Sequence, residues 1–331
     1  MSPRAFICGC AGLALSEADA GFIKSAQPWG LILFRRNIDT PQQVAGLVRH
    51  FREITGRADA PVLIDQEGGR VQRLNLPHWR AYPNARQLAA CGREAVILST
   101  RLMAHDMATL GINIDCLPVL DVPVAGGHEV IGNRAYSLDG EVVASMGRAA
   151  AEALMAGGVL PVMKHIPGHG RAGLDTHLAL PIVTESRAVL EASDFAPFRA
   201  CRDLPIAMTA HVVFSGIDPE NPATLSAKVI REIVRGFIGF DGLLLSDDLS
   251  MKALSGTFHD KTTRLFAAGV DIALHCNGDI GEAEEVAAAT PVLAGRALQR
   301  AQAALACLGK PQAFDPVDAA RKLDEMLAVT A

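Results

Sequence analysis

Short apolar runs alternate with longer amphipathic segments along most of the chain. The short runs consist largely of β-branched or other apolar residues and predict buried strands, whereas the longer segments repeat apolar residues with a helical period. Eight strands are predicted, at Ala5–Cys8, Gly30–Phe34, Val62–Ile64, Asn113–Cys116, Leu160–Met163, Ile206–Met208, Leu243–Leu245 and Ile272–Leu274.

Helical segments lie between these strands, and several open with Ser or Thr and close with Gly, as helix caps prefer. They are predicted at Thr40–Ile54, Glu94–Leu110, Gly140–Ala156, Glu185–Cys201, Ala227–Gly236 and Met251–Ala268. Strict alternation of strand and helix indicates a parallel sheet. Because there are eight such units and no dinucleotide-binding glycine pattern follows the first strand, we predict an α/β fold, a (β/α)₈ TIM-type barrel, rather than an open doubly wound sheet.

Two further helices are predicted after the eighth strand, at Val292–Cys307 and Pro316–Val329. We expect residues 1–310 to form the barrel and residues 311–331 to form a C-terminal helical tail packed on its outside. A chain of 331 residues is long enough for one barrel-sized domain with a large core.

The composition is that of a globular protein, with half of the residues apolar and a fifth charged. The 31 basic and 36 acidic side chains give a net charge of −5, without the basic stripe that nucleic-acid binding requires. The longest uncharged stretch, Leu204–Ile217, has 14 residues, fewer than the roughly 20 of a membrane-spanning helix. We therefore expect neither a nucleic-acid nor a membrane partner, and we expect a monomer.

Seven cysteines are scattered through mostly apolar segments, at positions 8, 10, 91, 116, 201, 276 and 307. Their odd number and wide spacing favour buried reduced thiols over a disulfide framework. The apolar residues before Cys10 are too few for a secretion signal, so Ala5–Cys8 is interpreted as the first strand. We expect a cytoplasmic protein.

Polar residues cluster where the predicted strands end, and barrel active sites are built at the carboxyl ends of the strands. These residues are Asp65, Lys164, His165, His211, Asp247, Asp248 and His275. A single histidine at such a place is more often a structural hydrogen-bonding residue than a catalyst, which is our interpretation of His211 and His275. The whole set together predicts an active site.

The loop after the fifth strand, Lys164–Gly170 (KHIPGHG), is followed by Asp175, Thr176 and His177. One hypothesis is a metal site made from His165, His169, Asp175 and His177. The charge of Lys164 and the Pro-Gly pair, which prevents helical i, i+4 spacing of the histidines, disfavour it. The other hypothesis is that Asp175 orients His177 as a proton-transfer pair.

Two carboxylates, Asp247 and Asp248, end the seventh strand. Adjacent side chains in a strand point to opposite sides, so only one of them can face the barrel axis directly. We expect Asp247 to face the site and Asp248 to cap the next helix or orient its neighbours. A carboxylate opposite a general acid, among side chains that bind hydroxyl groups, is the arrangement that retaining glycoside cleavage requires.

Several motifs together resemble those of glycoside hydrolase family 3 β-N-acetylglucosaminidases, the single-domain bacterial enzymes of cell-wall recycling. They are Gly30–Ile38 (GLILFRRNI), Ile64–Leu74 (IDQEGGRVQRL), Pro118–Val122 (PVLDV), Ile131–Leu138 (IGNRAYSL), Lys164–Gly170, Asp175–His177 (DTH) and Ser246–Met251 (SDDLSM). The resemblance covers roughly residues 5–280, with the motifs in matching order and spacing.

The resemblance implies a barrel enzyme that removes terminal β-linked N-acetylglucosamine, chiefly from N-acetylglucosaminyl-1,6-anhydro-N-acetylmuramyl peptides, without a metal or other cofactor. It implies that Asp247 is the nucleophile, His177 the general acid/base and Asp175 its partner. The residues implied to bind sugar hydroxyls are Asp65, Arg134, Lys164 and His165. The sequence departs from the expected Asp, Ser and Phe at Asn133, Ala135 and Tyr136, beside Arg134.

Three alternatives remain at this point. Phosphate rather than water could attack the glycosyl-enzyme, since a neutral imidazole repels an anion less than a carboxylate base does. A metal-dependent barrel hydrolase would lose activity on chelation. A non-catalytic sugar-binding barrel is disfavoured by the presence of Asp247, Asp175 and His177.

Overall fold

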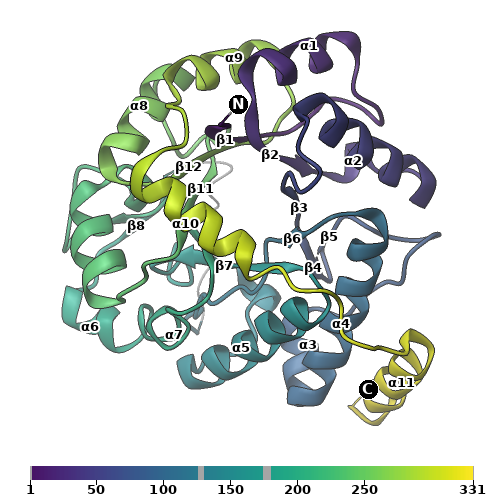
Figure 1. Cartoon of the computed structure of the whole chain (residues 1–331). Helices are drawn as coiled ribbons and strands as arrows, with labels where there is room; N and C mark the ends of the chain where they lie inside the picture. Colours follow the sequence, from purple (N-terminus) through teal and green to yellow (C-terminus); the bar gives the residue numbers. More distant parts are fainter. Residues whose placement is uncertain (1, 126–129, 174–179, 331) are drawn as a thin grey trace.

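Eight parallel strands close into a barrel, which a ring of helices surrounds (Figure 1). This computed structural model describes residues 2–125, 130–173 and 180–330. Around the barrel the strands follow the order β1-β12-β11-β9-β7-β6-β3-β2. Their bounds are Arg4–Cys8 (β1), Pro28–Leu33 (β2), Val62–Ile64 (β3), Ile114–Asp115 (β6), Leu160–Ile166 (β7), Ile206–Thr209 (β9), Leu243–Asp248 (β11) and Ile272–His275 (β12). All eight predicted strands, and with them the TIM-type fold, are confirmed.

The outer helices and two small sheets complete the fold. The helices are Glu17–Ala26 (α1), Pro41–Thr55 (α2), Ala85–Ala90 (α3), Arg93–Leu110 (α4), Gly140–Ala156 (α5), Arg187–Ala192 (α6), Ala196–Ala200 (α7), Phe258–Ala268 (α8), Ile280–Ala289 (α9), Gly295–Ala306 (α10) and Pro316–Thr330 (α11). The small sheets pair Gln66–Gly68 (β4) with Val71–Gln72 (β5), and Ile182–Val183 (β8) with Val213–Phe214 (β10).

Three predicted helices differ from the observed ones. The single helix expected at Glu185–Cys201 is divided into α6 and α7, because Pro197 has no N–H to continue a helix and lies instead in the first turn of α7. Asp194, between the two helices, accepts a hydrogen bond from Arg171 on the loop after β7 (2.7 Å). The helix expected from Met251 begins only at Phe258, after Gly256 in a left-handed conformation (φ +99°). The segment expected at Ala227–Gly236 forms a wider π-helix, Val229–Phe237.

Side chains of the barrel strands point alternately inward and outward, as the strand period of two requires. In β1, Ile7 packs with the inward-facing residues Leu63, Val162 and Leu245, whereas the neighbouring Phe6 packs under the outer helices. The barrel interior is therefore a filled apolar core rather than a channel.

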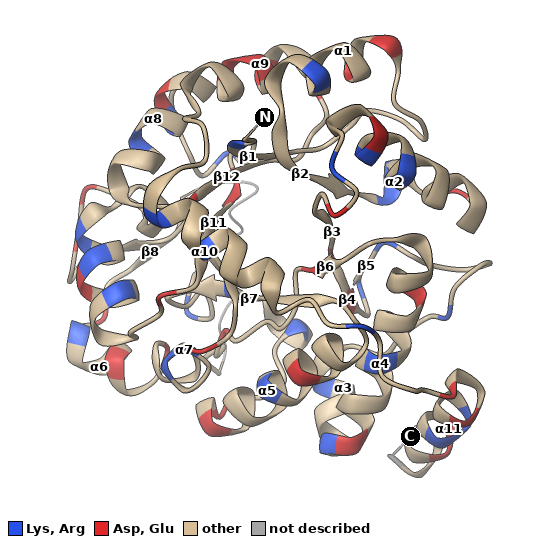
Figure 2. Ribbon diagram, in the orientation of Figure 1, with Lys and Arg blue, Asp and Glu red and all other residues tan. Residues whose placement is uncertain are grey.

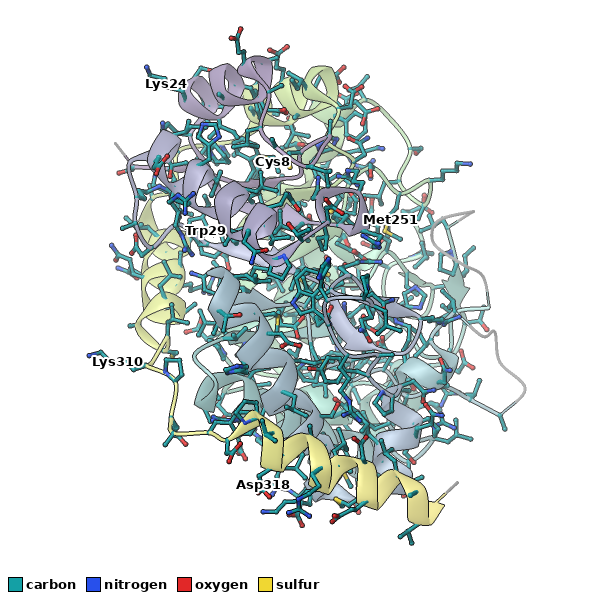
Figure 3. All side chains as sticks on the ribbon, turned by 90° about the vertical axis from the view of Figure 1, so that its right-hand side faces the viewer. Cys8, Lys24, Trp29, Met251, Lys310 and Asp318 are labelled. Carbon is teal, nitrogen blue, oxygen red and sulfur yellow. The ribbon has the colours of Figure 1, made fainter. Side chains whose placement is uncertain are left out.

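Helix α10 covers the end of the barrel at which the strands begin. Its Ala301 and Ala304 join the interior cluster, and Arg300 forms ion pairs with Asp241 and Asp271, which lie just before β11 and β12. Figure 3 shows α10 on the left and Met251, from the loop after β11, on the right, at the two ends of the barrel. With α10 over the strand starts, the opposite end is left for the chemistry.

Helix α11 lies beside α3 and α4 at the periphery (Figure 1). Arg80 pairs with Asp324 of α11, and the Arg101 guanidinium of α4 lies 4.7 Å from the centre of the Phe314 ring in the segment that leads to α11. The division into a barrel ending at residue 310 and a tail stays a prediction.

Lys and Arg are interspersed with Asp and Glu over the outer helices (Figure 2). In the view shown, the wall does not carry an extended surface of one sign, in keeping with the net charge of −5. Across the ranges that the structure describes, every helix is too short or too polar to cross a bilayer.

Candidate active site

In three strands of the barrel, the row of inward-facing apolar side chains ends in a charged residue. Leu63, Val162 and Leu245 belong to the barrel interior. Two residues further along the same strands, the inward positions are Asp65, Lys164 and Asp247. These three charged side chains therefore form the last layer of the core, at the carboxyl ends of the strands.

A pocket enclosing about 750 Å³, part of it open to solvent, lies above this layer. Its apolar floor and walls include Phe34, Met208, Met251 and Cys276. The charged and imidazole side chains that line it are Asp65, Arg73, Arg134, Lys164, His165, His169, Asp247 and Asp248. The five described residues for which the sequence analysis predicted a catalytic or sugar-binding role, Asp65, Arg134, Lys164, His165 and Asp247, therefore meet in one pocket.

Lys164 is the centre of the charged network, with only 2% of its side chain exposed. Its Nζ lies 2.8 Å from Asp65 Oδ1 and 2.7 Å from Glu67 Oε1. The other oxygen of Asp65 pairs with Arg73 (3.0 Å). Both oxygens of Asp65 are thus held by cations, which fixes the carboxylate at the pocket wall.

Arg134 is held in the same network by a bidentate ion pair. Its Nε and one terminal nitrogen each lie 2.8 Å from an oxygen of Glu67, a geometry that fixes the guanidinium plane. Glu67 is buried and does not line the pocket itself. It therefore positions two pocket cations, Arg134 and Lys164, from below.

The network keeps its members ionised in spite of their burial. Burial raises the pKa of Asp65, but Lys164 and Arg73 hold it below its ordinary value. In the same way, Arg134 and Lys164 outweigh burial and lower the pKa of Glu67 to about 2. Burial lowers the pKa of Lys164, but the two carboxylates raise it above its ordinary value.

Asp247 and Asp248 differ in how their carboxylates are bonded. Asp248 Oδ1 accepts hydrogen bonds from the backbone N–H groups of Ser250 (3.0 Å) and Cys276 (3.1 Å), and its Oδ2 accepts from the Ser250 hydroxyl. Asp247 Oδ1 accepts only from the N–H of Asp248 (2.8 Å), and its Oδ2 has no hydrogen-bond partner among the described residues. Asp247 thus has an oxygen free for a ligand, whereas Asp248 holds the loop.

Asp247 is also ionised at neutral pH. Burial raises its pKa, but the neighbouring His211 and His165 and the N–H of Asp248 lower it below its ordinary value. A carboxylate with one unoccupied oxygen in a largely buried pocket can attack an electrophilic carbon.

His211 and His275 are bound to their own surroundings. The ring nitrogens of His211 lie 2.8 Å from Thr224 Oγ1 and 3.0 Å from the carbonyl oxygen of Asp248. His275 Nε2 lies 3.1 Å from Glu282 Oε2. Neither histidine lines the pocket, which agrees with the structural interpretation of both.

The first residues after β7 pack against the segment that follows β6 and are hydrogen-bonded to it. Gly170 lies against the backbone of Val122, and a Cβ added there would be 2.1 Å from the Val122 carbonyl oxygen. Asp121, beside Val122, accepts hydrogen bonds from His165 and His169. These contacts fix the position of the start of the loop, whose later part contains the predicted acid/base, His177.

Gly170→Ala should therefore displace the loop and destabilise the fold. Overpacking of this kind costs about 1–3 kcal/mol. The expected result is a clearly lower Tm, measured by thermal unfolding. Gly173→Ala is the matched control in the same loop, because a Cβ there meets no atom of the described residues within 4 Å. Equal melting temperatures for the two variants would contradict the proposed close approach.

Asp175 and His177 lie outside the described residues, so their predicted pairing stays a prediction. The metal hypothesis depends on the same two residues together with His165 and His169. Within the described ranges, no group of three or more His, Cys, Asp or Glu side chains is arranged to hold a metal ion. The imidazole of His169 is buried, and burial together with His165 lowers its pKa to about 4, so it is neutral.

Three residues of the site were not assigned a role from the sequence, namely Glu67, Arg73 and Asp121. Each lies within a motif quoted above, Ile64–Leu74 or Pro118–Val122. Arg73 could have been considered as a second basic residue near Asp65. Glu67 and Asp121 act on other side chains rather than on a ligand, and only the three-dimensional contacts reveal such a role.

Comparison with known proteins places this architecture in a family. The family model described as the N-terminal domain of glycosyl hydrolase family 3 matches residues 9–304. A β-hexosaminidase of Pseudomonas aeruginosa is 38% identical over 281 residues, 80% of each chain. One of Shewanella frigidimarina is 34% identical over 283 residues, covering 82% of this chain and 81% of that protein.

Solved structures agree. Native NagZ from Neisseria gonorrhoeae matches with a TM-score of 0.85 and 29% identity, over 99% of this chain and 97% of its own. A family 3 β-N-acetylglucosaminidase from Paenibacillus sp. matches with a TM-score of 0.82 and 32% identity over 99% of this chain, which spans 62% of that longer protein. The chain therefore belongs to glycosyl hydrolase family 3, and it is an enzyme of the glycoside hydrolase class.

Proposed function

We propose that the protein is a retaining exo-β-N-acetylglucosaminidase that removes terminal β-linked N-acetylglucosamine from muropeptides during cell-wall recycling. The observation that carries the proposal is the free carboxylate oxygen of Asp247 at the pocket, opposite the fixed cluster of Asp65, Lys164 and Arg134. The names β-hexosaminidase and β-N-acetylglucosaminidase among the relatives support the sugar specificity. The muropeptide aglycone rests on the resemblance of the motifs.

The nucleophile in this proposal is Asp247. Its free oxygen attacks the anomeric carbon, the bond to the leaving oxygen breaks, and His177 gives its proton to that oxygen. A covalent glycosyl-enzyme results. Neutral His177 then takes a proton from water, whose oxygen replaces Asp247 at the anomeric carbon, so the β configuration is retained. Asp175 orients His177 and supports its protonated form.

The charged cluster binds the terminal sugar. Asp65 accepts hydrogen bonds from sugar hydroxyls, while Arg134 and Lys164 donate, and His165 contributes a ring nitrogen. Because each of these groups is already held by an opposite charge or a hydrogen bond, little rearrangement is needed on binding, and the cluster is preorganised for the transition state.

The proposal is tested with a β-N-acetylglucosaminide that carries a chromogenic leaving group, assayed with and without phosphate and with a chelator. We expect release of free sugar that is independent of both. Phosphate-dependent formation of a sugar 1-phosphate would identify a phosphorylase instead, and loss of activity on chelation a metal-dependent hydrolase. The names of the relatives favour hydrolysis over phosphorolysis.

The role of His177 predicts a dependence on the leaving group. His177→Ala should slow a natural disaccharide by about 10²–10⁴-fold, the usual contribution of general acid catalysis, but slow an aryl glycoside much less. The reason is that a phenolate with a low pKa departs without protonation. Pre-steady-state glycosylation rates for both substrates measure the difference. Equal losses on the two substrates would remove His177 from the acid role.

A further inference from the structure

Asp121 lies beside the pocket residue His165 because the chain after β6 continues alongside β7. Leu120 donates its N–H to the carbonyl oxygen of Lys164 (2.7 Å), and Lys164 donates its own N–H to Pro118 (3.0 Å). This parallel pairing places the next residue, Asp121, beside His165. Asp121 is fully buried, and its side-chain hydrogen bonds within the described residues are to His165 and His169.

The two oxygens of Asp121 have different partners. Oδ1 accepts from the backbone N–H groups of His165 (3.2 Å) and His169 (2.6 Å). Oδ2 lies 2.7 Å from Nδ1 of the His165 ring. The other ring nitrogen of His165, Nε2, has no hydrogen-bond partner among the described residues, and the side chain lines the pocket.

The protonation of the ring follows from the nature of the partner. Asp121 Oδ1 accepts from two backbone N–H groups, those of His165 and His169, and such bonds favour the ionised form, so the group is a carboxylate. A carboxylate only accepts hydrogen bonds, and the short contact therefore requires a proton on Nδ1 of His165.

We propose that Asp121 is a positioning residue, which holds His165 in the tautomer protonated at Nδ1 and so presents Nε2 to the pocket as an acceptor for a sugar hydroxyl. Lys164 and Arg134 can only donate hydrogen bonds. A hydroxyl that donates to His165 Nε2 and accepts from Lys164 would be bound by both of its functions, so that His165 adds a neutral acceptor to the charged acceptor Asp65. The identity of the ligand as a sugar hydroxyl rests on the proposed function, whereas the tautomer of His165 does not.

Asp121→Asn tests the tautomer while it conserves the size of the side chain. The two backbone N–H groups require the amide oxygen at the position of Oδ1, which leaves the amide NH₂ facing Nδ1 of His165. Two donors cannot pair, so Nδ1 must accept and the ring proton must move to Nε2. The variant should therefore keep its fold and present a donor where the wild type presents an acceptor.

The first measurement is a long-range ¹H–¹⁵N spectrum of the free enzyme labelled at histidine, with the His165 signals assigned by their loss in His165→Ala. We expect Nδ1–H in the wild type and Nε2–H in Asp121→Asn. His211 is an internal reference for the opposite tautomer, because its Nε2 donates to the carbonyl of Asp248. A wild-type His165 protonated at Nε2, or at both nitrogens, would overturn the proposal.

The second measurement is kinetic and uses a double-mutant cycle. In Asp121→Asn, His165 Nε2 is a donor instead of an acceptor, so the hydrogen bond from the sugar hydroxyl is lost. We expect this loss to lower kcat/KM by about 10- to 100-fold. In the His165→Ala background the same substitution should change kcat/KM by less than about threefold, since its effect passes through His165. Equal losses in both backgrounds would mean that Asp121 acts through the loop backbone, and would overturn the proposal.

The two measurements distinguish a failure of the proposed tautomer from a failure of the proposed function. If the wild type did not hydrolyse any β-N-acetylglucosaminide, the proposed function would fail. The spectrum of the free enzyme would still decide the tautomer, because it needs no substrate.

Discussion

Replacing Asp247 by Asn is expected to abolish turnover of every β-N-acetylglucosaminide, with a loss in kcat of about 10⁴-fold or more. An amide is too weak a nucleophile to form the covalent intermediate, while its size and the hydrogen bond from the Asp248 N–H are retained. The loss should be as large for an aryl glycoside as for a disaccharide, since both need the same attack. Steady-state kinetics with both substrates measure it.

Asp248→Asn is the matched control, one residue along the same strand. The Asp248 carboxylate holds Ser250 and Cys276, so its loss should disturb the loop and reduce activity much less. Azide gives a second check. With Asp247→Gly and an aryl β-glycoside, azide should restore turnover by displacing the phenolate and leaving an α-glycosyl azide. An active Asp247→Asn enzyme beside an inactive Asp248→Asn enzyme would move the nucleophile by one residue.

Replacing Lys164 by Met is expected to lower the free energy of unfolding by about 3 kcal/mol at neutral pH, as well as to impair sugar binding. The buried ammonium group lies between Asp65 and Glu67, and its loss leaves two carboxylates close together with less compensating charge. Denaturant unfolding at pH 7 measures the change. Lys261→Met is the control, because that buried lysine donates to the carbonyl oxygen of Leu249 rather than to a carboxylate.

The pH dependence of this loss has a definite sign. In the wild type the pKa values of Asp65 and Glu67 are below their ordinary values, so their contribution to stability is present above about pH 4.5 and is lost as the pH falls toward 2. In Lys164→Met the same carboxylates bind protons more readily, which relieves their repulsion. The difference between the two proteins should therefore narrow from pH 7 to pH 4. A difference that stays constant would show that packing, not charge, makes Lys164 important for stability.

The strands and their order could be predicted from the sequence because each is a local apolar run that must be buried on all sides. The predicted bounds of the helices were less accurate than those of the strands. The break between α6 and α7 has a local signal in Pro197, which the prediction of one helix over Glu185–Cys201 did not take into account. The ion pair of Asp194 with Arg171, a residue on another loop, could not be predicted from that segment.

The sequence by itself determined the barrel and the position of Asp65, Lys164 and Asp247 at the ends of its strands, since the apolar runs and the order of the elements are local properties of the chain. Only the tertiary structure decided how these groups are paired and oriented. Glu67 meets Arg134, and Asp121 meets His165, across 67 and 44 residues of chain. Such contacts depend on the register and closure of the barrel, because the protonation and orientation of a charged group depend on the residues that the fold places within hydrogen-bonding distance of it.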